Sequence, residues 1–377
     1  HLGASGNYLA EFGPDFTERH QTPWGAGLNL DGPDGGGVRA FVVDNALRWL
    51  RDFHVDALRL DAVHAIQDDS PTHILAELSA RVTELEEEIG RPLGLVAESD
   101  LNDVTMVTPL SEGGLGMDGQ WADDVHHALH AWLTGETFGY YVDFGSAEVL
   151  AHALRHVFVH DGGHSTFRGR DWGRPVPDDV DRRRFVTFTE NHDQIGNRAL
   201  GDRPESRLAP GTVAGGAALL LLSPFSPMVF QGQEWATRSP FQFFTDHGPD
   251  LADLVVEGRK EEFAGHGWEE LYGGDVEVPS PQDPATFHAS RLPWEELEVP
   301  EHAAMFAWYR DLIALRREFG DGSAHQLPEV DHGDGWFRMV RGPLSVIVVP
   351  GPEGRTVREP AGASTALAFG DVTVGGD

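Results

Sequence analysis

Two acidic residues, Asp61 and Glu98, each follow a short apolar stretch of the chain. Arg59 precedes Asp61 by two positions in "VDALRLDAVHAI" (residues 55–66), so on a strand both side chains point to one face. A neighbouring guanidinium favours the ionised form of a carboxylate, which is the form that a nucleophile requires. Glu98 follows "LGLVA" (residues 93–97), where desolvation favours the protonated form that a general acid requires. The two residues therefore have the character of the pair that cleaves a glycosidic bond.

A third carboxylate, Asp193, ends the polar run "NHD" after the apolar stretch 184–190. Its charge suits it to bind sugar hydroxyls and to support an oxocarbenium-like transition state. A structural ion pair between Arg59 and Asp61 explains that one motif equally well. Three carboxylates after three predicted strands favour chemistry, and a separation of about 5–5.5 Å between the first two would make the reaction retaining.

Helices and strands alternate along most of the chain. Apolar residues at helical spacing predict helices, and short apolar runs bounded by glycine, proline or polar residues predict strands. The predicted helices cover residues 38–53, 71–88, 212–222 and 305–319, and the predicted strands cover residues 55–60, 93–98, 184–190 and 227–230. This alternation predicts an α/β fold with a parallel sheet. Carboxylates at the C-terminal ends of successive strands are typical of the active site of a (β/α)8 TIM barrel.

The spacing of the three carboxylates limits the number of βα units between them. Asp61 and Glu98 are 37 residues apart (98 − 61), close to one barrel unit of roughly 30 residues. Glu98 and Asp193 are 95 residues apart (193 − 98). The longer interval suits either three units or two units with an insertion.

The chain changes character after Gly320. Short apolar stretches at residues 336–340 and 344–349 are separated by glycine and proline, which predicts strands in place of helices. We therefore expect a catalytic domain over residues 1–324 and a small all-β domain over residues 325–377.

Three segments resemble sequence regions of the α-amylase superfamily, glycoside hydrolase family 13. They are "DALRLDAVHAI", "LVAESD" and "FTENHDQIGNR", and together in this order they are highly specific. The resemblance implies that Asp61 is the nucleophile, Glu98 the acid/base and Asp193 the transition-state stabiliser. Arg59 and His192 match the arginine and the histidine that accompany these carboxylates in the family.

Flanking segments are similar to those of the trehalohydrolases within this family. They are "HLGASGNYLAEFGPDFTERHQTPWGAGLNLDGP", "QWADDVHHALHAWLTGETFGYY", "NHDQIGNRALGDR" and "SPFQFFTDH". His64, at the third position after the proposed nucleophile, suits the same subgroup, and His1 resembles the last residue of the family's first region. The resemblance implies that the substrate-binding residues are His1, Arg59, His64, Asp123, Asp124, His126 and His192.

The resemblance also implies an activity. A trehalohydrolase cleaves the α-1,4-glucosidic bond next to the terminal trehalose of maltooligosyltrehalose, with a retaining mechanism, and releases trehalose. It would act in trehalose biosynthesis, in the cytoplasm, on the product of a maltooligosyltrehalose synthase. Two alternatives stay open: a transferase such as a 1,4-α-glucan branching enzyme, and an inactive fragment that only binds sugar.

Two positions depart from the trehalohydrolase pattern. Gln233 in "MVFQGQEWA" stands where the subgroup usually carries a second acidic residue, and Glu190 stands where relatives often carry a neutral one. Because neither is one of the three carboxylates, the departures concern sugar binding and leave the reaction unaffected.

If His1 ends the third strand of the family's barrel, the first three strands are absent from the 377 residues. We therefore expect an incomplete (β/α)8 barrel of about strands 4–8, followed by a β domain that is also incomplete. An open sheet of this kind exposes strand edges and apolar surface. This exposure argues against activity of the 377 residues alone.

Composition excludes several other classes of protein. The chain has 28 basic and 61 acidic residues, a net charge of −33 that repels nucleic-acid phosphates and favours a neutral ligand. Its longest apolar run, residues 217–222, is too short to cross a membrane. There is no cysteine, so thiol chemistry and disulfides are excluded.

Histidine and tryptophan residues near the motifs have simpler interpretations. His126 and His130, with Asp123 nearby, have metal-ligand spacing but no glutamate in an H-E-x-x-H setting, so we favour a role in lining the cleft or capping a helix. We expect neither a metal nor an organic cofactor. Three tryptophans adjoin motifs and could stack on sugar rings, although core packing is the commoner role of such residues: Trp24, Trp121 and Trp235.

Overall fold

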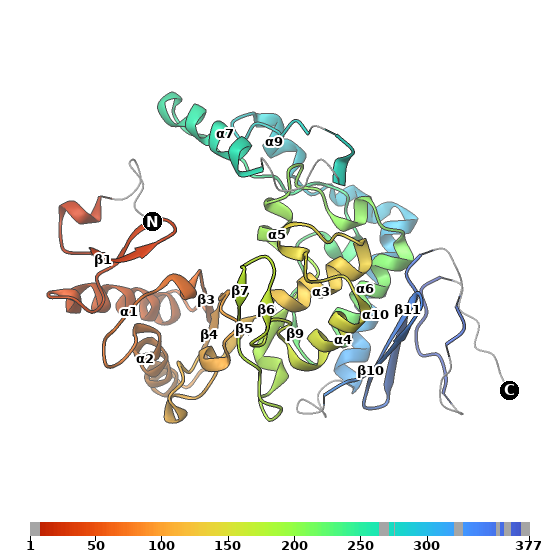
Figure 1. The fold of residues 1–377 in the computed structure, drawn as a ribbon, viewed down its shortest axis with the longest axis horizontal. Helices are drawn as coiled ribbons and strands as arrows, with labels where there is room; N and C mark the ends of the chain where they lie inside the picture. Colours follow the sequence, from red (N-terminus) through yellow and green to blue (C-terminus); the bar gives the residue numbers. More distant parts are fainter. Residues whose placement is uncertain are drawn as a thin grey trace. The chain divides into compact units, whose positions relative to one another are not determined.

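The computed structural model describes residues 8–263, 271–274, 276–319, 327–351, 355–357 and 363–370. It divides the chain into two compact units (Figure 1). The first unit comprises the described residues up to 122 and the segments 172–176 and 184–186. The second unit comprises residues 123–171 and 177–183 and the described residues from 187 onward.

A parallel sheet forms the centre of the first unit. Its strands lie in the order β3 (Ala57–Leu60), β4 (Gly94–Ala97), β5 (Gly119–Trp121) and β8 (Phe185–Thr187). The prediction of a parallel sheet is confirmed. Only β5 lies between β4 and β8, so the long interval between the second and third carboxylates holds two strand-to-strand steps with an insertion.

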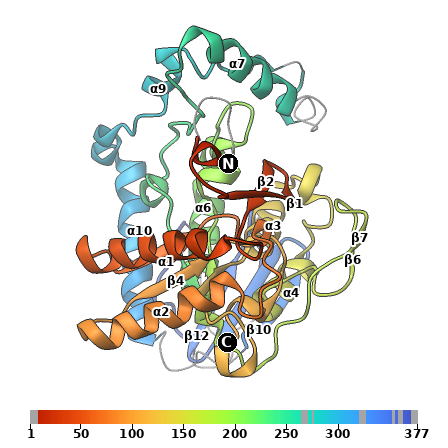
Figure 2. The ribbon, with the colours of Figure 1, turned by 90° about the vertical axis from the view of Figure 1, so that its left-hand side faces the viewer.

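Helix α1 (Gly35–Asp52) confirms the helix predicted over residues 38–53. Its buried stripe contains Val43, Leu47 and Leu50, which recur at helical spacing. Three aromatic residues of the predicted range 38–53 are exposed, although apolar periodicity would place them in the core: Phe41, Trp49 and Phe53. Figure 2 shows α1 beside α2 (Ile74–Ile89).

Helix α2 begins three residues later than predicted because its cap is His73, not Pro71. The His73 Nδ1 atom accepts a hydrogen bond from the backbone N–H of Leu75 at 3.2 Å. The helix ends at Gly90, whose φ of 65° lies in the left-handed region that glycine adopts without strain.

A hairpin precedes α1 in the first unit. Strands β1 (Phe16–Thr22) and β2 (Gly25–Leu28) pair antiparallel. The side-chain amide of Asn29 then donates hydrogen bonds to the carbonyl oxygens of Pro14 at 2.9 Å and Pro33 at 3.1 Å. These bonds fix the connection between the hairpin and the helix.

The second unit is mainly helical. Its helices are α3 (Asp123–Thr134), α4 (Ala147–His156), α5 (His192–Gly196), α6 (Pro210–Leu222), α7 (Pro249–Phe263), α9 (Pro284–Ala289) and α10 (Pro300–Phe319). Its short strands are β6 (His164–Ser165), β7 (Arg170–Asp171) and β9 (Ser226–Pro227).

Helix α6 lies at the centre of the second unit and is apolar on all sides. Residues 212–222 of this helix are buried with the single exception of Gly215. A Cβ atom on Gly215 would lie 2.4 Å from Cγ1 of Val348, and one on Gly216 would lie 2.7 Å from Cδ1 of Leu133. The two glycines therefore allow a strand and a helix to approach α6 closely.

Two arginines bind the carbonyl groups at the C-terminal end of α6. Arg316 Nη1 donates hydrogen bonds to the carbonyl oxygens of Leu221 at 2.7 Å and Ser223 at 2.9 Å, and Arg341 Nη1 donates to that of Leu222 at 3.1 Å. A helix leaves its last carbonyls without partners of its own. Both cations satisfy these groups and also oppose the negative end of the helix dipole.

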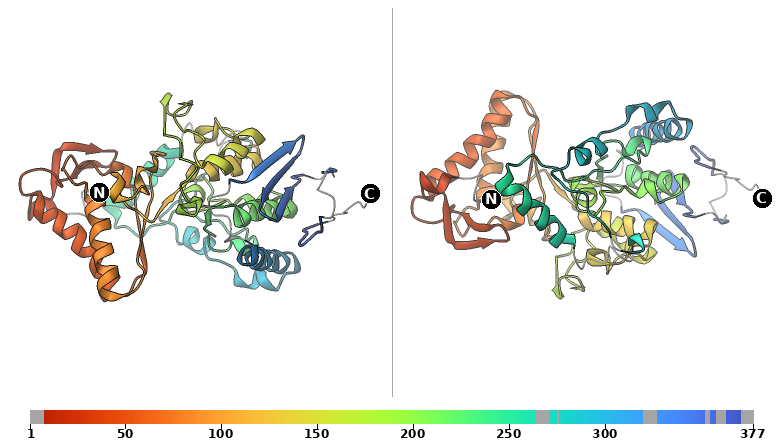
Figure 3. Two further views of the ribbon diagram at one scale, coloured as in Figure 1. Left: turned by 90° about the horizontal axis from the view of Figure 1, so that it is seen from below. Right: turned by 90° about the horizontal axis from the view of Figure 1, so that it is seen from above.

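An antiparallel sheet near the C-terminus packs on α6 (Figure 3). It consists of β10 (Glu329–Gly333), β11 (Trp336–Arg341) and β12 (Leu344–Val348), which confirms the change to β structure. The expected boundary at residues 324–325 lies outside the described residues. A separate domain over residues 325–377 stays a prediction.

Two strands are shorter than their apolar runs predict. β8 ends at Thr187, three residues before the predicted end, and β9 covers only Ser226 and Pro227. After β9 the backbone N–H of Phe230 donates to the side chain of Gln233 at 2.9 Å, so the chain turns away from the sheet. Apolar runs do not reveal such side-chain hydrogen bonds. Among the described helices, none combines the length and the apolar composition needed to cross a membrane.

Candidate active site

Asp61 and Glu98 occupy equivalent positions at the ends of neighbouring strands. Leu60 pairs with Ala97 in the parallel register of β3 and β4, so the next residues, Asp61 and Glu98, fall in one row across the sheet. Arg59 lies two positions before Asp61 and shares its face. Arg59, Asp61 and Glu98 are thus brought together at the C-terminal ends of two strands.

The guanidinium of Arg59 contacts both carboxylates. Its Nη1 atom donates a hydrogen bond to Oδ1 of Asp61, and its Nη2 atom lies 3.6 Å from Oε2 of Glu98. The Asp61 side chain is 66% exposed, whereas that of Glu98 is 19% exposed. One carboxylate is open to an incoming molecule, and the other is largely shielded from water.

The turn after β3 holds Glu98 through the backbone. The N–H of Ala62 donates a hydrogen bond to Oε2 of Glu98, and the N–H of Val63 donates to the Glu98 carbonyl oxygen at 3.0 Å. Ala62 has a φ of 44°, a left-handed conformation that costs a non-glycine residue of order 1–3 kcal/mol. The strained turn directs a donor at the carboxylate and so fixes its orientation.

His64 lies in the same turn and contacts the segment after β4. Its Nδ1 atom accepts a hydrogen bond from the backbone N–H of Asp100 at 3.4 Å. The carbonyl oxygen of Asp100 in turn accepts a hydrogen bond from Nε1 of Trp172 at 2.8 Å. His64 thus connects the turn after β3 with the segment after β4, and its contact with substrate stays a prediction.

Trp121 is a member of this group that the sequence did not assign. It ends β5, and the Cζ atom of Arg59 lies 4.4 Å from the centre of its ring. β5 was not predicted because its three residues, Gly119–Trp121, form no recognisable apolar run. Without the strand register, the sequence offers no signal for the contact.

Asp193 lies in the second unit, in the first turn of α5. Asn191 caps this helix: its side-chain oxygen accepts hydrogen bonds from the backbone N–H groups of Asp193 at 2.8 Å and Gln194 at 3.0 Å. The Asp193 side chain is 46% exposed, and its Oδ2 atom lies 3.4 Å from Nε2 of His192. The predicted pair His192–Asp193 thus forms one exposed polar group at a helix N-terminus.

Asp123 and Asp124 begin α3 but differ in environment. Asp123 Oδ1 accepts a hydrogen bond from Nε2 of Gln194 at 3.3 Å, which connects α3 with the helix that carries Asp193. Asp124 is 3% exposed, and its Oδ2 atom accepts backbone hydrogen bonds from Val159 and His160. The geometry favours a supporting role for Asp124, while contact between Asp123 and substrate stays a prediction.

His126 is buried among other rings. It is 1% exposed, stacks on His130 at 5.4 Å and lies 3.0 Å, between Nδ1 atoms, from His127. Burial, reinforced by the charges of neighbouring histidines, lowers the pKa of His126 well below its ordinary value. A neutral, buried ring is better suited to packing inside the unit than to contact with a sugar.

The two departures from the family pattern, Glu190 and Gln233, are both buried in the second unit. Glu190 Oε2 accepts a hydrogen bond from Nη1 of Arg203 at 2.8 Å, and Gln233 Nε2 donates to the hydroxyl of Tyr309 at 2.9 Å. Glu190 and Glu205 line a cavity of about 20 Å³, enough for one water molecule. Burial, together with the charge of Glu190, raises the pKa of Glu205. Glu190 and Gln233 therefore bind side chains in the interior of this unit, where the sequence had suggested an effect on sugar binding.

One cluster of the first unit has the residue types of a metal site. His20, Asp31 and Asp69 present ligand atoms within 4.8 Å of one another. However, Arg19 Nη2 contacts Asp31 Oδ2 and lies 3.7 Å from Asp69 Oδ2, so a cation of the chain already balances the carboxylates. The cluster therefore consists of ion pairs that hold the hairpin against Asp69. His1, also predicted to bind substrate, lies outside the described residues.

Relatives of known name match the entire chain, although no family model matches it. A malto-oligosyltrehalose trehalohydrolase from Arthrobacter ramosus is 49% identical over 378 residues, which cover 100% of this chain and 64% of the relative. The enzyme of the same name from Mycobacterium tuberculosis is 46% identical over 381 residues, with the same two coverages. This chain therefore spans slightly less than two-thirds of the length of these relatives.

A solved structure extends the likeness to the fold. The crystal structure of a Salmonella typhimurium protein, provisionally named an α-amylase, is 35% identical and superimposes with a TM-score of 0.78. The match covers 90% of this chain and 57% of that one. The resemblance to the α-amylase superfamily that the motifs indicated is confirmed.

Proposed function

The chain is a relative of the malto-oligosyltrehalose trehalohydrolases, and from that premise we propose that it carries the catalytic carboxylates of such an enzyme. The proposed reaction is hydrolysis of the α-1,4-glucosidic bond next to the terminal trehalose of maltooligosyltrehalose. Its products are free trehalose and a shortened maltooligosaccharide. We also propose that the enzyme acts in the cytoplasm, in trehalose biosynthesis, on the product of a maltooligosyltrehalose synthase.

One observation carries the proposal. Asp61 and Glu98 fall in one row at the ends of β3 and β4, and a single guanidinium, that of Arg59, contacts both. Glycosidic bond cleavage needs two carboxyl groups of different character on either side of the reacting carbon. The exposure of Asp61 and the shielding of Glu98 supply that difference.

In the first step we assign Asp61 as the nucleophile. An oxygen of its carboxylate attacks the anomeric carbon, and the bond from that carbon to the leaving trehalose oxygen breaks. Glu98 donates its proton to that oxygen, so trehalose leaves as a neutral molecule. A glycosyl ester on Asp61 remains, with Glu98 as a carboxylate.

In the second step Glu98 takes a proton from water. The water oxygen bonds to the anomeric carbon, the ester bond to Asp61 breaks, and both carboxyl groups return to their starting forms. Two displacements at one carbon retain its configuration. Arg59, which contacts both carboxylates, is placed to orient them in both steps.

The other predicted site residues receive supporting roles in this proposal. Asp193, with His192 at its side, would bind sugar hydroxyls and support positive charge on the reacting sugar. Asp123, which contacts the helix of Asp193, would bind the same sugar or an adjoining one. His64 would bind from the turn after β3, and the sheet β3–β4–β5–β8 would form one part of the family's barrel.

Analysis of products tests the activity directly. The protein at its full encoded length should convert maltotriosyltrehalose to trehalose and maltotriose, read by chromatography. It should do so with a specificity constant at least roughly tenfold above that for maltopentaose, because polar groups placed for trehalose lose partners with maltose. Equal specificity constants would contradict the trehalose assignment, and release of longer or branched glucans would favour the branching transferase.

A further inference from the structure

Trp121 takes the third place in the row that holds the two carboxylates. Glu98 follows Ala97, and Ala97 pairs with Gln120, so the residue after Gln120 falls beside Glu98. The row across the ends of β3, β4 and β5 is therefore Asp61, Glu98 and Trp121. Because residues of one row point to one face of a sheet, the indole lies on the face that bears both carboxylates.

We infer that Trp121 is a positioning residue for the reaction: its ring face holds the Arg59 guanidinium against Asp61 and Glu98. The inference rests on the proposed function, since it assigns the geometry of that same site. The Arg59 Cζ atom lies 4.4 Å from the ring centre, within the range of a cation–π contact. Arg59 thus has the indole on one side and two carboxylates at its nitrogen atoms.

Two buried nitrogen atoms of Arg59 indicate that the guanidinium depends on the indole ring for its position. Its Nε and Nη2 atoms are buried and have no hydrogen-bond partner among the described residues. Hydrogen bonds alone therefore do not fix the guanidinium, which donates from Nη1 to Asp61. An aromatic face attracts a desolvated cation and limits its rotation without supplying an acceptor atom.

Trp121 is itself held rigidly and is closed to a sugar. It is 7% exposed, it pairs with Val186 of β8, and the backbone N–H of Ala122 donates to the Val186 carbonyl oxygen at 2.9 Å. A ring that stacks on a sugar must present a face to solvent, and here the guanidinium lies over the ring. Trp121 therefore does not suit the stacking on a sugar ring that its sequence position left open.

Spectroscopy tests the contact independently of any activity. In the full-length protein, the ring current of Trp121 should shift the Arg59 side-chain proton resonances to higher field in an NMR spectrum that correlates arginine Nε with its proton. Disappearance of the resonance in Arg59→Lys identifies it. Trp121→Leu should return the resonance to the ordinary arginine range, and Trp121→Phe should keep part of the shift.

Kinetics tests the positioning role. Trp121→Leu should lower kcat roughly three- to thirtyfold, the span that a cation–π contact of ordinary strength corresponds to, with KM within a factor of two. Trp121→Phe should recover part of the loss. The same Trp121→Leu change made in an Arg59→Leu background should lower kcat by less than twofold further, because its effect passes through Arg59.

Trp132→Leu is the matched control for loss of a large ring. Trp132 packs against Phe337 in the second unit at a centroid distance of 5.3 Å, so its loss should lower the melting temperature and leave kcat and the Arg59 resonance unchanged. The inference would be overturned if Trp121→Leu lowered kcat as much in the Arg59→Leu background as in the wild type. It would also be overturned if the Arg59 resonance did not move when Trp121 is replaced. A Trp121-dependent resonance in a protein that hydrolyses no maltooligosyltrehalose would overturn the proposed function and support the contact.

Discussion

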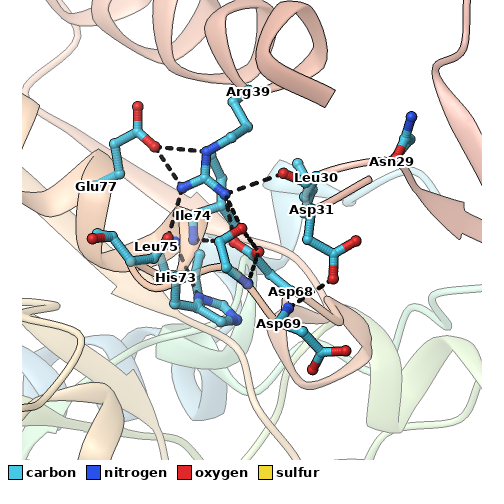
Figure 4. Close-up of polar contacts among 12 residues, drawn as sticks. Asn29, Leu30, Asp31, Arg39, Asp68, Asp69, His73, Ile74, Leu75 and Glu77 are labelled. Atoms are coloured by element: carbon cyan, nitrogen blue, oxygen red, sulfur yellow. Dashed lines mark hydrogen bonds and ion pairs between the residues drawn. The ribbon is translucent and has the colours of Figure 1, made fainter. Parts of the chain in front are cut away.

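Two arginines of the first unit, Arg39 and Arg59, each contact two carboxylates, but their surroundings differ. Arg39 on α1 connects this helix to α2 and to the loop before it (Figure 4). Its Nε atom donates to Glu77 at 2.8 Å, and Nη1 donates to Asp68 at 2.7 Å and to the Ser70 hydroxyl at 3.0 Å. Its Nη2 atom donates to a backbone carbonyl at 2.8 Å, so all three nitrogen atoms have partners.

The carboxylate of Asp68 is equally well satisfied. Besides Arg39, it accepts hydrogen bonds from the backbone N–H groups of Ser70 at 3.0 Å and Ile74 at 2.6 Å. Its side chain is 0% exposed. The Asp68 carboxylate is therefore closed to an incoming molecule, and the cluster acts as a connection between elements.

Arg59 is satisfied only in part, and one of its carboxylates faces solvent. Asp61 is two-thirds exposed, and two nitrogen atoms of Arg59 find no hydrogen-bond partner among the described residues. An arginine that contacts two carboxylates is therefore not by itself a sign of chemistry. Exposure of a carboxylate and incomplete hydrogen bonding distinguish the candidate active site from the structural cluster.

The largest expected effect is the loss of turnover when either carboxylate at Arg59 is neutralised. Asp61→Asn and Glu98→Gln should each lower kcat by at least roughly 10³-fold, because both remove proton or nucleophile chemistry with almost no change of volume. Substrate binding, measured by calorimetry, should persist. Asp68→Asn is the matched control: it should destabilise the fold and leave kcat per folded molecule unchanged, and a rate near wild type in Asp61→Asn would refute the assignment.

Removal of Arg39 should produce the largest loss of stability. Arg39→Leu leaves the buried Asp68 carboxylate without its cation, which costs about 3 kcal/mol at the lower end for a broken buried ion pair. Chemical denaturation should show this decrease in the free energy of unfolding. The pH–rate profile of the remaining folded protein should match that of the wild type, and a displaced profile would mean that the two clusters are coupled.

Removal of Arg59 should affect the rate of the reaction more than the stability of the fold. Arg59→Leu should lower kcat roughly ten- to a hundredfold, since a hydrogen bond to a charged group contributes about 1.5–3 kcal/mol. A kcat near that of the wild type would assign Arg59 to structure alone, like Arg39.

The smallest effect concerns acid stability near the hairpin. The backbone N–H of Asp69, together with His20 and Arg19 and against the effect of burial, lowers the pKa of Asp31 to about 2. A carboxyl with a lowered pKa contributes stability above its unfolded value near 3.8, and this contribution is lost as the pH falls towards 2. Asp31→Asn should therefore be less stable than wild type at pH 6, with the difference narrowing between pH 4 and pH 2 in thermal unfolding. A constant difference would exclude this linkage.

The sequence predicted those parts of the fold that depend on local patterns. Helix α1 and the strands β3 and β4 follow from apolar periodicity, and Arg59 and Asp61 share a face because side chains alternate along a strand. The row that joins Asp61 to Glu98 depends on strand register, which periodicity does not contain. β5 was missed for a related reason, since its three residues are defined by their neighbours and not by their own pattern.

Burial was the other quantity that the sequence could not supply. Asp124 and His126 lie in a segment that resembles the trehalohydrolases, and both were predicted to contact substrate. In the structure both are buried, Asp124 by backbone donors of a distant segment and His126 by stacked rings. Long-range contacts of this kind leave no trace in the spacing of residues.

Capture of the glycosyl intermediate tests the division of roles between Asp61 and Glu98 most directly. The Glu98→Gln variant of the full-length protein, given an α-maltosyl fluoride, needs no acid for departure of fluoride but lacks the base for hydrolysis. A maltosyl ester should accumulate, and mass spectrometry of peptides should locate it on Asp61, in residues 55–66. A stable ester on another residue, or turnover with inversion and no ester, would contradict Asp61 as nucleophile and Glu98 as its acid/base partner.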